Sequence, residues 1–367
     1  MTDREYMQRA IDLALLGAGH TNPNPMVGAV IVKDERIVSE GYHEKYGDLH
    51  AERNALSKCG WKAPGATMYV TLEPCCHHGK QPPCTDAVIE SGVSKVFIGS
   101  RDPNPLVSGK GVQLLRDAGI EVVTDFMREE CDAINPVFFH YISTGLPYVI
   151  SKYAMTMDGK IATRTGASKW ITGEDARQRV QEDRGRYAGI MVGIGTVLAD
   201  DPLLTCRIPG KNNPVRIICD TNLRIPEDSQ IVKTAKDVKT IIATGSRAED
   251  KIARLTEAGC SIINLPLSAE HIDLKALMKA LGELQIDSVY IEGGGKLHWS
   301  ALRSGMVNKV QVFVAPKIFG GKDAPTPVSG IGCDVPDNGF MLTPPEITRY
   351  GDDILLESEV IPCSQES

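Results

Sequence analysis

Apolar and polar positions follow two rhythms along the first part of the chain, one with apolar residues three or four positions apart and one with short β-branched runs. The first rhythm predicts amphipathic helices and the second predicts strands. Helices are predicted at 6–16, 50–58, 83–91 and 111–118, and strands at 27–32, 36–42, 67–72, 95–99 and 121–124. Helices that alternate with strands in this way predict an α/β/α sandwich.

The alternation stops between residues 135 and 147, and the stretch 141–147, with its serine, threonine, glycine and proline, is typical of a linker. Beyond it, strands are predicted at 148–153, 189–192, 215–220, 238–243, 261–265, 288–291 and 309–314, and helices at 175–186, 248–258 and 273–281. The run 352–360 fits a last antiparallel strand. Because 367 residues exceed what one core usually supports, we predict two α/β domains, 1–145 and 146–367.

The charge balance bears on the kind of ligand. A net charge of −7 provides no basic footprint for nucleic acid, so we expect a small-molecule substrate. No apolar run approaches the roughly 18 residues of a membrane span, and the charged start of the chain does not resemble an export signal. We therefore expect a cytoplasmic protein without membrane or nucleic-acid partners, and we also expect a homo-oligomer. Its ten cysteines are then free thiols and metal ligands rather than disulfides.

One histidine, one glutamate and two cysteines occur in the order used by zinc deaminases: His50, Glu52, Cys75 and Cys84. His50, Cys75 and Cys84 are the predicted ligands, because one imidazole and two thiolates hold zinc and leave a fourth position open for water. Glu52 would not bind the metal. It would instead move a proton from that water to the departing amine.

Two cysteines compete for the first sulfur position. Eight residues separate Cys75 from Cys84, so the match contains an inserted loop compared with the usual P-C-x-x-C. Cys76 is the alternative to Cys75, which we favour because it follows Pro74. Cys84 is favoured because it precedes a predicted helix, whose N-terminal field stabilises a thiolate. Buried cysteines and an unrelated surface histidine are the alternative interpretation of the whole set.

A glycine run follows a predicted strand in the second domain. Gly293, Gly294 and Gly295 lie between the strand 286–292 and the helical stretch 297–302. Backbone N–H groups and a helix dipole at such a junction favour phosphate, so a nucleotide cofactor fits. The alternative is a simple tight turn, since G-x-G-x-x-G is absent.

A second cluster, 193–207, is predicted to be a loop that lets the backbone approach a ligand closely. It runs through small residues into Asp200 and Asp201 and ends at Arg207. The alternative role of the two acids is to cap a helix. Arg207 and Arg184 are candidates for holding a substrate phosphate, and solvated surface positions are the alternative for both.

These motifs together resemble the bifunctional deaminase-reductase family of riboflavin biosynthesis over nearly the whole chain. The resemblance is carried by residues 24–28, 50–52, 75–84, 102–105, 157–160, 168–172, 193–202 and 292–294. It implies a cytidine-deaminase-like α/β/α sandwich followed by a dihydrofolate-reductase-like α/β domain, and it makes the long cysteine loop this family's own version of the motif. Asn22 departs from the histidine common in the family and is assigned no role.

The resemblance also implies roles for residues at matching positions. Those implied to line the deaminase pocket are Asn24, His43, His77 and Lys80. Those implied to contact the reductase cofactor are Ala154, Trp170, Thr196, Asp200, Thr221, Gly294, Gly295, Lys296, Leu297, His298, Trp299 and Ser300. Those implied to contact the reductase substrate are Ser168, Arg184, Leu204, Arg207 and Glu292.

Two reactions are implied, which use one zinc ion per chain and NADPH: deamination of a diaminopyrimidinone ribosylamine phosphate, then reduction of its ribose to ribityl. The reduction needs a proton donor, and we expect Lys152, Asp200 and Glu292 to face one pocket, with Lys152 and Asp200 as catalytic residues. An ion pair between Lys152 and Asp200 that only shapes the site is the alternative.

Two rival functions remain at this stage. One is a nucleoside or tRNA deaminase with an unrelated appended domain. The acidic charge balance argues against tRNA as its substrate. The other is a silent nucleotide-binding protein with structural zinc. The presence of Glu52 disfavours the second rival, because a structural site needs no acid/base group.

Overall fold

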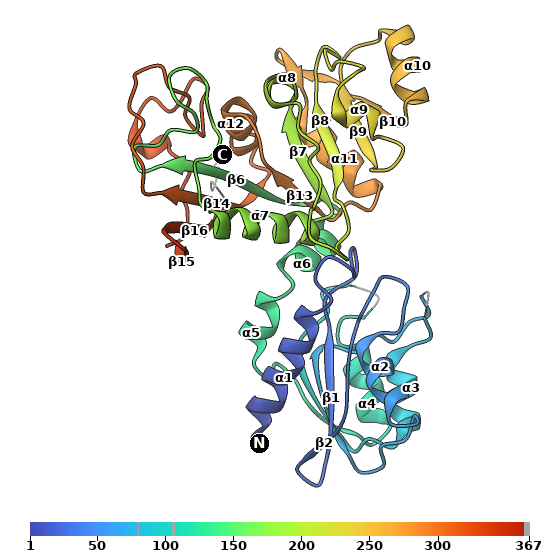
Figure 1. The fold of residues 1–367 in the computed structure, drawn as a ribbon. Helices are drawn as coiled ribbons and strands as arrows, with labels where there is room; N and C mark the ends of the chain where they lie inside the picture. The colour runs from blue at the N-terminus through green and yellow to red at the C-terminus, as the bar shows by residue number, and fades with distance from the viewer. Residues whose placement is uncertain (80, 105–106, 363–367) are drawn as a thin grey trace. The chain divides into compact units, whose positions relative to one another are not determined.

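The computed structural model describes residues 1–79, 81–104 and 107–362. Contacts within the chain divide it into two compact units, Met1–Gly145 and Leu146–Ser367 (Figure 1). We call these the first and the second unit. Within the described ranges, no helix has both the length and the apolar character needed to cross a membrane.

The first unit contains one five-stranded sheet with helices on both faces (Figure 1). The strands, in their order across the sheet, are β2 (Arg36–Tyr42), β1 (Gly28–Lys33), β3 (Thr67–Leu72), β4 (Lys95–Ser100) and β5 (Glu121–Val123). Strand β1 is antiparallel to both of its neighbours, whereas β3, β4 and β5 are parallel. The carboxyl ends of the parallel strands therefore meet at one edge, where sites of open α/β sheets usually lie.

Six helices cover this sheet. They are α1 (Asp3–Leu15), α2 (Ala51–Lys58), α3 (Cys84–Ser91), α4 (Lys110–Asp117), α5 (Arg128–Ala133) and α6 (Pro136–Thr144). Helices α2, α3 and α4 share one apolar core with the sheet, and α1 packs on the opposite face. Thr2 caps α1 in a capping box with Glu5. A Cβ at Gly28 would overlap the Ala10 carbonyl oxygen, so glycine there lets α1 lie directly on β1.

The linker predicted at 141–147 is partly wrong, because its first residues belong to helix α6 (Pro136–Thr144), and the boundary between the two units follows that helix. Pro136 occupies the first turn, where its missing N–H costs nothing, and Gly145 ends the helix in the left-handed region with φ 71°. Phe138 is buried in the first unit's core. The serine, threonine and glycine that resemble a linker are thus the last turn and the cap of a helix. Packing of its aromatic side chains in the core stabilises that helix.

The second unit is built on a nine-stranded sheet. Across the sheet the strands are β10 (Cys260–Asn264), β9 (Thr240–Thr244), β8 (Val215–Cys219), β7 (Gly189–Gly193), β13 (Ser288–Ile291), β6 (Tyr148–Thr156), β14 (Val307–Ala315), β16 (Asp353–Glu359) and β15 (Glu346–Tyr350). The pairs from β10 to β14 are all parallel, and β16 is antiparallel to β14 as predicted for 352–360. A separate hairpin consists of β11 (Leu267–Ser268) and β12 (His271–Ile272).

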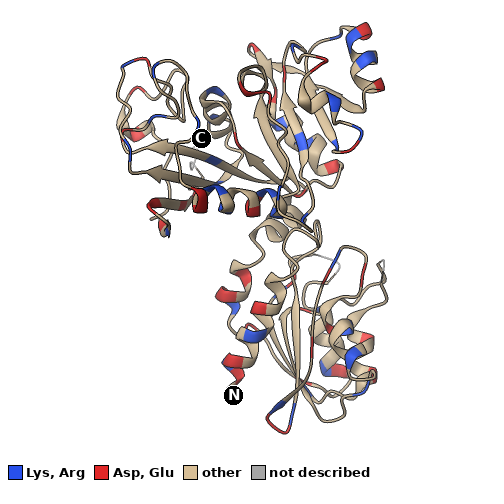
Figure 2. Ribbon diagram, in the orientation of Figure 1, with Lys and Arg blue, Asp and Glu red and all other residues tan. Residues whose placement is uncertain are grey.

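Helices cover both faces of this sheet as well. They are α7 (Glu174–Arg186), α8 (Ile194–Asp200), α9 (Gln230–Lys233), α10 (Glu249–Glu257), α11 (Leu274–Glu283) and α12 (Gly295–Arg303), with a short 3₁₀ turn at Pro336–Asn338. Helices α11 and α12 share one apolar core, and α8, α9 and α10 share a second core with the opposite face of the sheet. Helix α7 packs on β14 and β16. Figure 2 shows acidic and basic residues interspersed along α7 and α10.

The loop predicted at 193–207 is partly wrong, because its first half is helix α8. Ile194 and Val197, three positions apart, bury the inner face of this helix. Asp201 ends α8 in the left-handed region, and its carboxylate accepts a hydrogen bond from the Gln230 N–H at 2.8 Å, at the start of α9. The capping alternative therefore holds for Asp201.

Candidate active sites

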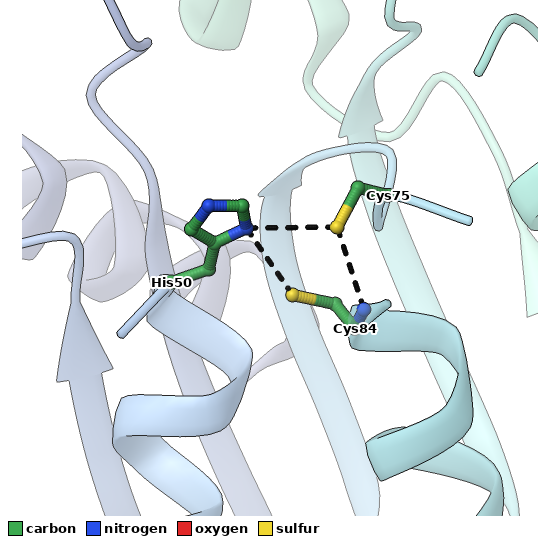
Figure 3. A group of neighbouring side chains, drawn as sticks. All are labelled: His50, Cys75 and Cys84. Atoms are coloured by element: carbon green, nitrogen blue, oxygen red, sulfur yellow. Dashed lines mark hydrogen bonds between the residues drawn. The ribbon is translucent and has the colours of Figure 1, made fainter. Parts of the chain in front are cut away.

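His50, Cys75 and Cys84 converge at the edge of the first unit's sheet (Figure 3). His50 is the N-cap residue of α2, Cys75 follows β3, and Cys84 begins α3. The His50 Nδ1 atom lies 3.5 Å from each sulfur, and the three ligand atoms lie within 4.8 Å of one another. A tetrahedral zinc site places its nitrogen and sulfur ligands about 3.5 Å apart, so this donor set fits zinc. In the described part of the chain, Cys76 does not belong to this group.

The Cys75 residue caps helix α3. Its sulfur accepts the Cys84 N–H at 3.4 Å, and its carbonyl oxygen accepts the Thr85 N–H at 3.2 Å. The Cys84 thiol donates to the same sulfur, and this bond, followed by the His50 contact, lowers the pKa of Cys75 to about 4 against the effect of burial. Donation to Cys75 and burial raise the pKa of Cys84. The N–H groups at the start of α3 therefore point to Cys75, whereas the sequence argument assigned the field of this helix to Cys84.

Glu52 lies in the first turn of α2, two residues after the histidine. Its side chain is nearly inaccessible, with 3% exposure. Burial, followed by the nearby Cys75 charge, raises the pKa of Glu52. A carboxyl group that is buried next to a ligand set, and that holds a proton more readily than usual, is suited to proton transfer.

Asn24 and His43 form a hydrogen-bonded pair beside the ligands. The His43 Nδ1 atom lies 3.0 Å from the Leu49 carbonyl oxygen, and its Nε2 atom lies 3.2 Å from Asn24 Nδ2. Burial lowers the pKa of His43, and a neutral ring that donates from Nδ1 accepts from Asn24 at Nε2. This bond fixes the orientation of the Asn24 amide, including its oxygen. The His43 ring is edge-on to the His50 ring, with ring centroids 5.2 Å apart.

Asn135 holds the segment that carries Asn24, a role that the sequence argument missed. Its buried amide donates to the Met26 carbonyl oxygen and accepts from the Met26 N–H, both at 2.8 Å. The two residues are 109 positions apart, so no local pattern could indicate the contact. The only sequence signal is an asparagine placed before the Pro136 that starts a helix.

Two further predicted pocket residues lie in the cysteine loop. His77 is half-buried, and its Nδ1 atom is inaccessible and lacks a hydrogen-bond partner in the described part of the chain. A buried polar atom without a partner is costly, so this atom calls for an explanation. Lys80 lies outside the described residues. Asp102 adds a carboxyl group near Cys75 and His77, and burial raises its pKa to about 6.

A buried ion cluster in the second unit joins three predicted residues. Glu292 follows β13, Lys152 lies on β6 and Arg184 lies on α7. The Arg184 Nε and Nη2 atoms donate to the two Glu292 oxygens at 2.6 and 3.1 Å, and Lys152 Nζ lies 3.2 Å from Oε2. Burial alone would raise the pKa of Glu292, but the Arg184 and Lys152 charges outweigh it and lower the pKa to about 2. Arg184 also donates to the Thr205 carbonyl oxygen at 3.1 Å, next to the buried Leu204.

Asp200 does not join this cluster. It is exposed at the end of α8, and within the described residues its side chain makes no hydrogen bond or ion pair. The proposed Lys152–Asp200 pair is therefore wrong, because Lys152 pairs with Glu292. The Arg207 side chain is also exposed, although its backbone N–H donates to the Gln181 side chain at 2.9 Å.

The predicted glycine run lies at the start of helix α12. Gly294 has φ 77°, a value that favours glycine, and it is the N-cap of α12. A Cβ on Gly293 would lie 2.6 Å from Thr196 Oγ1, so α8 and the run are in contact. Within the described chain, no acceptor is found for the N–H groups of Gly295 and Lys296.

Other residues of α12 face different surroundings. Leu297 belongs to the apolar core, and His298 is 2% exposed with its Nδ1 atom 2.8 Å from Ser151 Oγ. Burial lowers the pKa of His298 to about 4. These two side chains therefore support the helix from the sheet side. Trp299 and Ser300 are half-buried, and the Trp299 ring lies 5.8 Å from that of Phe340.

The remaining predicted cofactor and substrate residues lie on separate segments. Ala154 is half-buried on β6, and Ser168 is half-buried in the connection to α7. Trp170 is 59% exposed, with the Arg177 guanidinium 4.7 Å from its ring centre. Thr221 follows β8, and its hydroxyl accepts the Ile272 N–H at 3.3 Å.

Comparison with known proteins relates both units to one family. Residues 1–100 match the cytidine and deoxycytidylate deaminase zinc-binding region, and residues 147–356 match the RibD C-terminal domain. The riboflavin biosynthesis protein RibD of Actinobacillus pleuropneumoniae is 56% identical over 361 residues, which cover 98% of this chain and 96% of that protein. This chain belongs to the RibD family.

Solved structures agree with this assignment over both units. Acinetobacter baumannii RibD has a TM-score of 0.88 at 37% identity, and covers 98% of this chain and 99% of its own. A Thermotoga maritima diaminohydroxyphosphoribosylaminopyrimidine deaminase/5-amino-6-(5-phosphoribosylamino)uracil reductase has a TM-score of 0.84 at 39% identity, with 97% and 98% coverage. The predicted fold class is confirmed, and the chain is a bifunctional deaminase and reductase of riboflavin biosynthesis. The rival of an unrelated appended domain is wrong, because RibD relatives match across both units.

Proposed function

We propose that the first unit deaminates 2,5-diamino-6-(5-phosphoribosylamino)pyrimidin-4(3H)-one at His50, Cys75 and Cys84. The convergence of these three ligand atoms beside a buried Glu52 is the observation that carries the proposal. A zinc ion held there would leave a fourth position at which bound water ionises near neutral pH. Water enters the reaction and ammonia leaves, so a proton must move from the one to the other.

Glu52 is the group that moves this proton. Its raised pKa allows it to take up a proton inside a dry site and return it to the departing amine. Asn24, which the neutral His43 holds in place, is proposed to accept a hydrogen bond from the pyrimidine ring. His77 and Lys80 are proposed to bind the ribose phosphate, because an imidazole N–H and an ammonium group can both donate to phosphate oxygens.

The second unit is proposed to reduce the deaminated product. NADPH, when bound, would supply the hydride, and its phosphates fit the open N–H groups at the start of α12 together with Thr196 and Thr221. Lys152 is proposed to donate the proton that accompanies ring opening, with Glu292 fixing its position. Ser168, Leu204 and Arg207 are proposed to contact the substrate, with Arg207 offering its guanidinium to the phosphate.

Product analysis tests the assignment directly. The chain is incubated with the diaminopyrimidine substrate, with and without NADPH, and the products are identified by mass. Without NADPH we expect one amino group to be replaced by oxygen, and with NADPH we expect a product with two more hydrogens. Unchanged substrate in the presence of zinc, or deamination of cytidine instead, would contradict the proposal.

A further inference from the structure

The inserted loop between the two cysteines raises a physical problem. Eight residues separate Cys75 from Cys84, and holding the end of such an insertion beside the other ligands costs conformational entropy. Pro82 and Pro83 end this loop and have no N–H, so they cannot donate to any neighbour. Their carbonyl oxygens can only accept, and a donor from elsewhere must hold them.

Arg53 is that donor. Its Nε atom donates to the Pro82 carbonyl oxygen at 3.1 Å, and its Nη2 atom donates to the Pro83 carbonyl oxygen at 3.0 Å. A guanidinium presents two N–H groups in a rigid fork, so one side chain fixes two consecutive carbonyls. The Trp61 ring, 5.9 Å from the guanidinium carbon, covers the same group from beyond the end of α2.

The position of Arg53 connects the two halves of the ligand set. Arg53 lies in the first turn of α2, directly after Glu52 and three residues after His50. Pro83, which it holds, directly precedes Cys84. The same loop makes a second contact with the segment that precedes His50. The Gln81 side chain donates to the Gly47 carbonyl oxygen at 3.0 Å.

We propose that Arg53 is a positioning residue that clamps the inserted loop to α2 and thereby sets the place of Cys84 relative to His50. This inference rests on the proposed zinc site and adds a residue outside the ligand and acid/base set. A lysine offers one point charge and cannot bridge both carbonyls in a fixed geometry. The clamp therefore requires the arginine fork and not merely a positive charge.

Three variants of the full chain test the clamp. Arg53→Met keeps the side-chain stem and removes every donor, and Arg53→Lys keeps the charge. Lys58→Met is the matched control, because it removes one positive charge from the exposed last turn of the same helix. Zinc release to a competing chelator, kcat and KM of deamination, and reduction of the deaminated intermediate are measured for each.

We expect Arg53→Met to release zinc roughly 10- to 100-fold faster than the natural chain, as is usual when a residue that supports a ligand is removed. The zinc release rate of Arg53→Lys should be closer to that of Arg53→Met than to that of the natural chain. Lys58→Met should release zinc at the natural rate. The KM of deamination should rise, because the loop also carries His77, while reduction by the same protein stays unchanged and shows that the second unit is intact.

Equal zinc release by Arg53→Met and Lys58→Met, with an unchanged KM, would overturn the clamp. Failure of the natural chain itself to bind zinc would instead contradict the proposed function, so the two failures are distinguishable. If Arg53→Met does not fold, Arg53→Lys decides: zinc release at the natural rate overturns the clamp, and faster release supports it.

Discussion

The deaminase and reductase sites of this chain are assembled in different ways. The candidate deaminase ligands come from a short stretch, His50 to Cys84, in which a helix start, a strand end and a second helix start meet. The reductase cluster joins Lys152 to Glu292, 140 positions away, and Arg184 to Glu292, 108 positions away. One site is local in sequence and the other depends on the topology of the sheet.

This difference decides what a sequence can reveal. Strands β6 and β13 pair in parallel with Ser151 opposite Ile291, so the next residues, Lys152 and Glu292, emerge together at the same edge. Nothing in the spacing of those two residues specifies that register. The deaminase ligands, in contrast, are limited to few arrangements by the elements that lie between them.

Loss of one ligand is the largest perturbation of the local site. Cys84→Ser should lose its zinc and all deamination, because three protein ligands are the minimum for a catalytic zinc site. Cys76→Ser is the matched control and should keep its metal. Metal analysis of the two purified variants decides between them. Zinc retained by Cys84→Ser and lost by Cys76→Ser would move the ligand to Cys76.

Removal of the acid/base group should separate chemistry from metal binding. Glu52→Gln is expected to keep zinc and to lose deamination by about a hundredfold or more, the usual effect of removing a general acid/base. Reduction of the deaminated intermediate by the same variant should continue. A variant that also fails to reduce that intermediate would show that the two activities are not independent.

Glu292 offers a test of the reductase cluster, whose residues are far apart in the sequence. Glu292→Gln leaves Arg184 and Lys152 buried without their carboxylate, which should destabilise the second unit by about 3–5 kcal/mol near pH 7. The control Glu227→Gln removes an exposed partner of Arg254 and should destabilise the chain far less, because an ion pair in water contributes little to stability. Denaturant unfolding of both variants measures the difference.

The pH dependence of this effect has a definite sign. The folded pKa of Glu292 is about 2, below its ordinary value of 4.5. Its contribution is therefore fully present above pH 4.5 and is lost as the pH falls from 4.5 through 2. The stability gap between the natural chain and Glu292→Gln should narrow over that window, and a gap that widens there would contradict the assignment.

Sequence reasoning succeeded where residue spacing and local structure determine each other. The convergence of His50, Cys75 and Cys84, the first-turn position of Glu52 and most strands follow from motifs and periodicity alone. It failed where tertiary packing decides. Helix α6 looks like a linker until Phe138 is seen in the core, and the anchor of Met26 by Asn135 spans 109 positions. His298 was assigned to the cofactor, yet its ring is turned toward Ser151 on the sheet.

The glycine run should show a smaller effect, confined to the cofactor. Gly294→Val adds bulk and strain at φ 77° beside the open N–H groups of α12, and should weaken NADPH binding about tenfold. Gly305→Val is the matched control, because Gly305 has φ 71° just after the same helix and nothing within 4 Å of its Cβ position. Equilibrium titration with NADPH compares them. Equal affinity in the two variants would argue against phosphate binding at α12.

The smallest effect on the fold is expected at Asp200. Replacing this residue tests whether the reductase centre includes Asp200 or consists only of Lys152, Arg184 and Glu292. Asp200 is exposed at the C-terminal end of α8, where the helix dipole disfavours a carboxylate, so Asp200→Asn should not lower the unfolding temperature. The resemblance predicts that this variant lowers turnover more than NADPH affinity. Asp201→Ala is the control, because it removes the acceptor of the Gln230 N–H at a cost of about 1 kcal/mol and should leave turnover unchanged. Steady-state kinetics with varied NADPH measures both variants. Natural turnover in Asp200→Asn would leave Lys152, Arg184 and Glu292 as the whole ionisable centre, whereas reduced turnover with unchanged stability would mean that Asp200 acts on the substrate or cofactor.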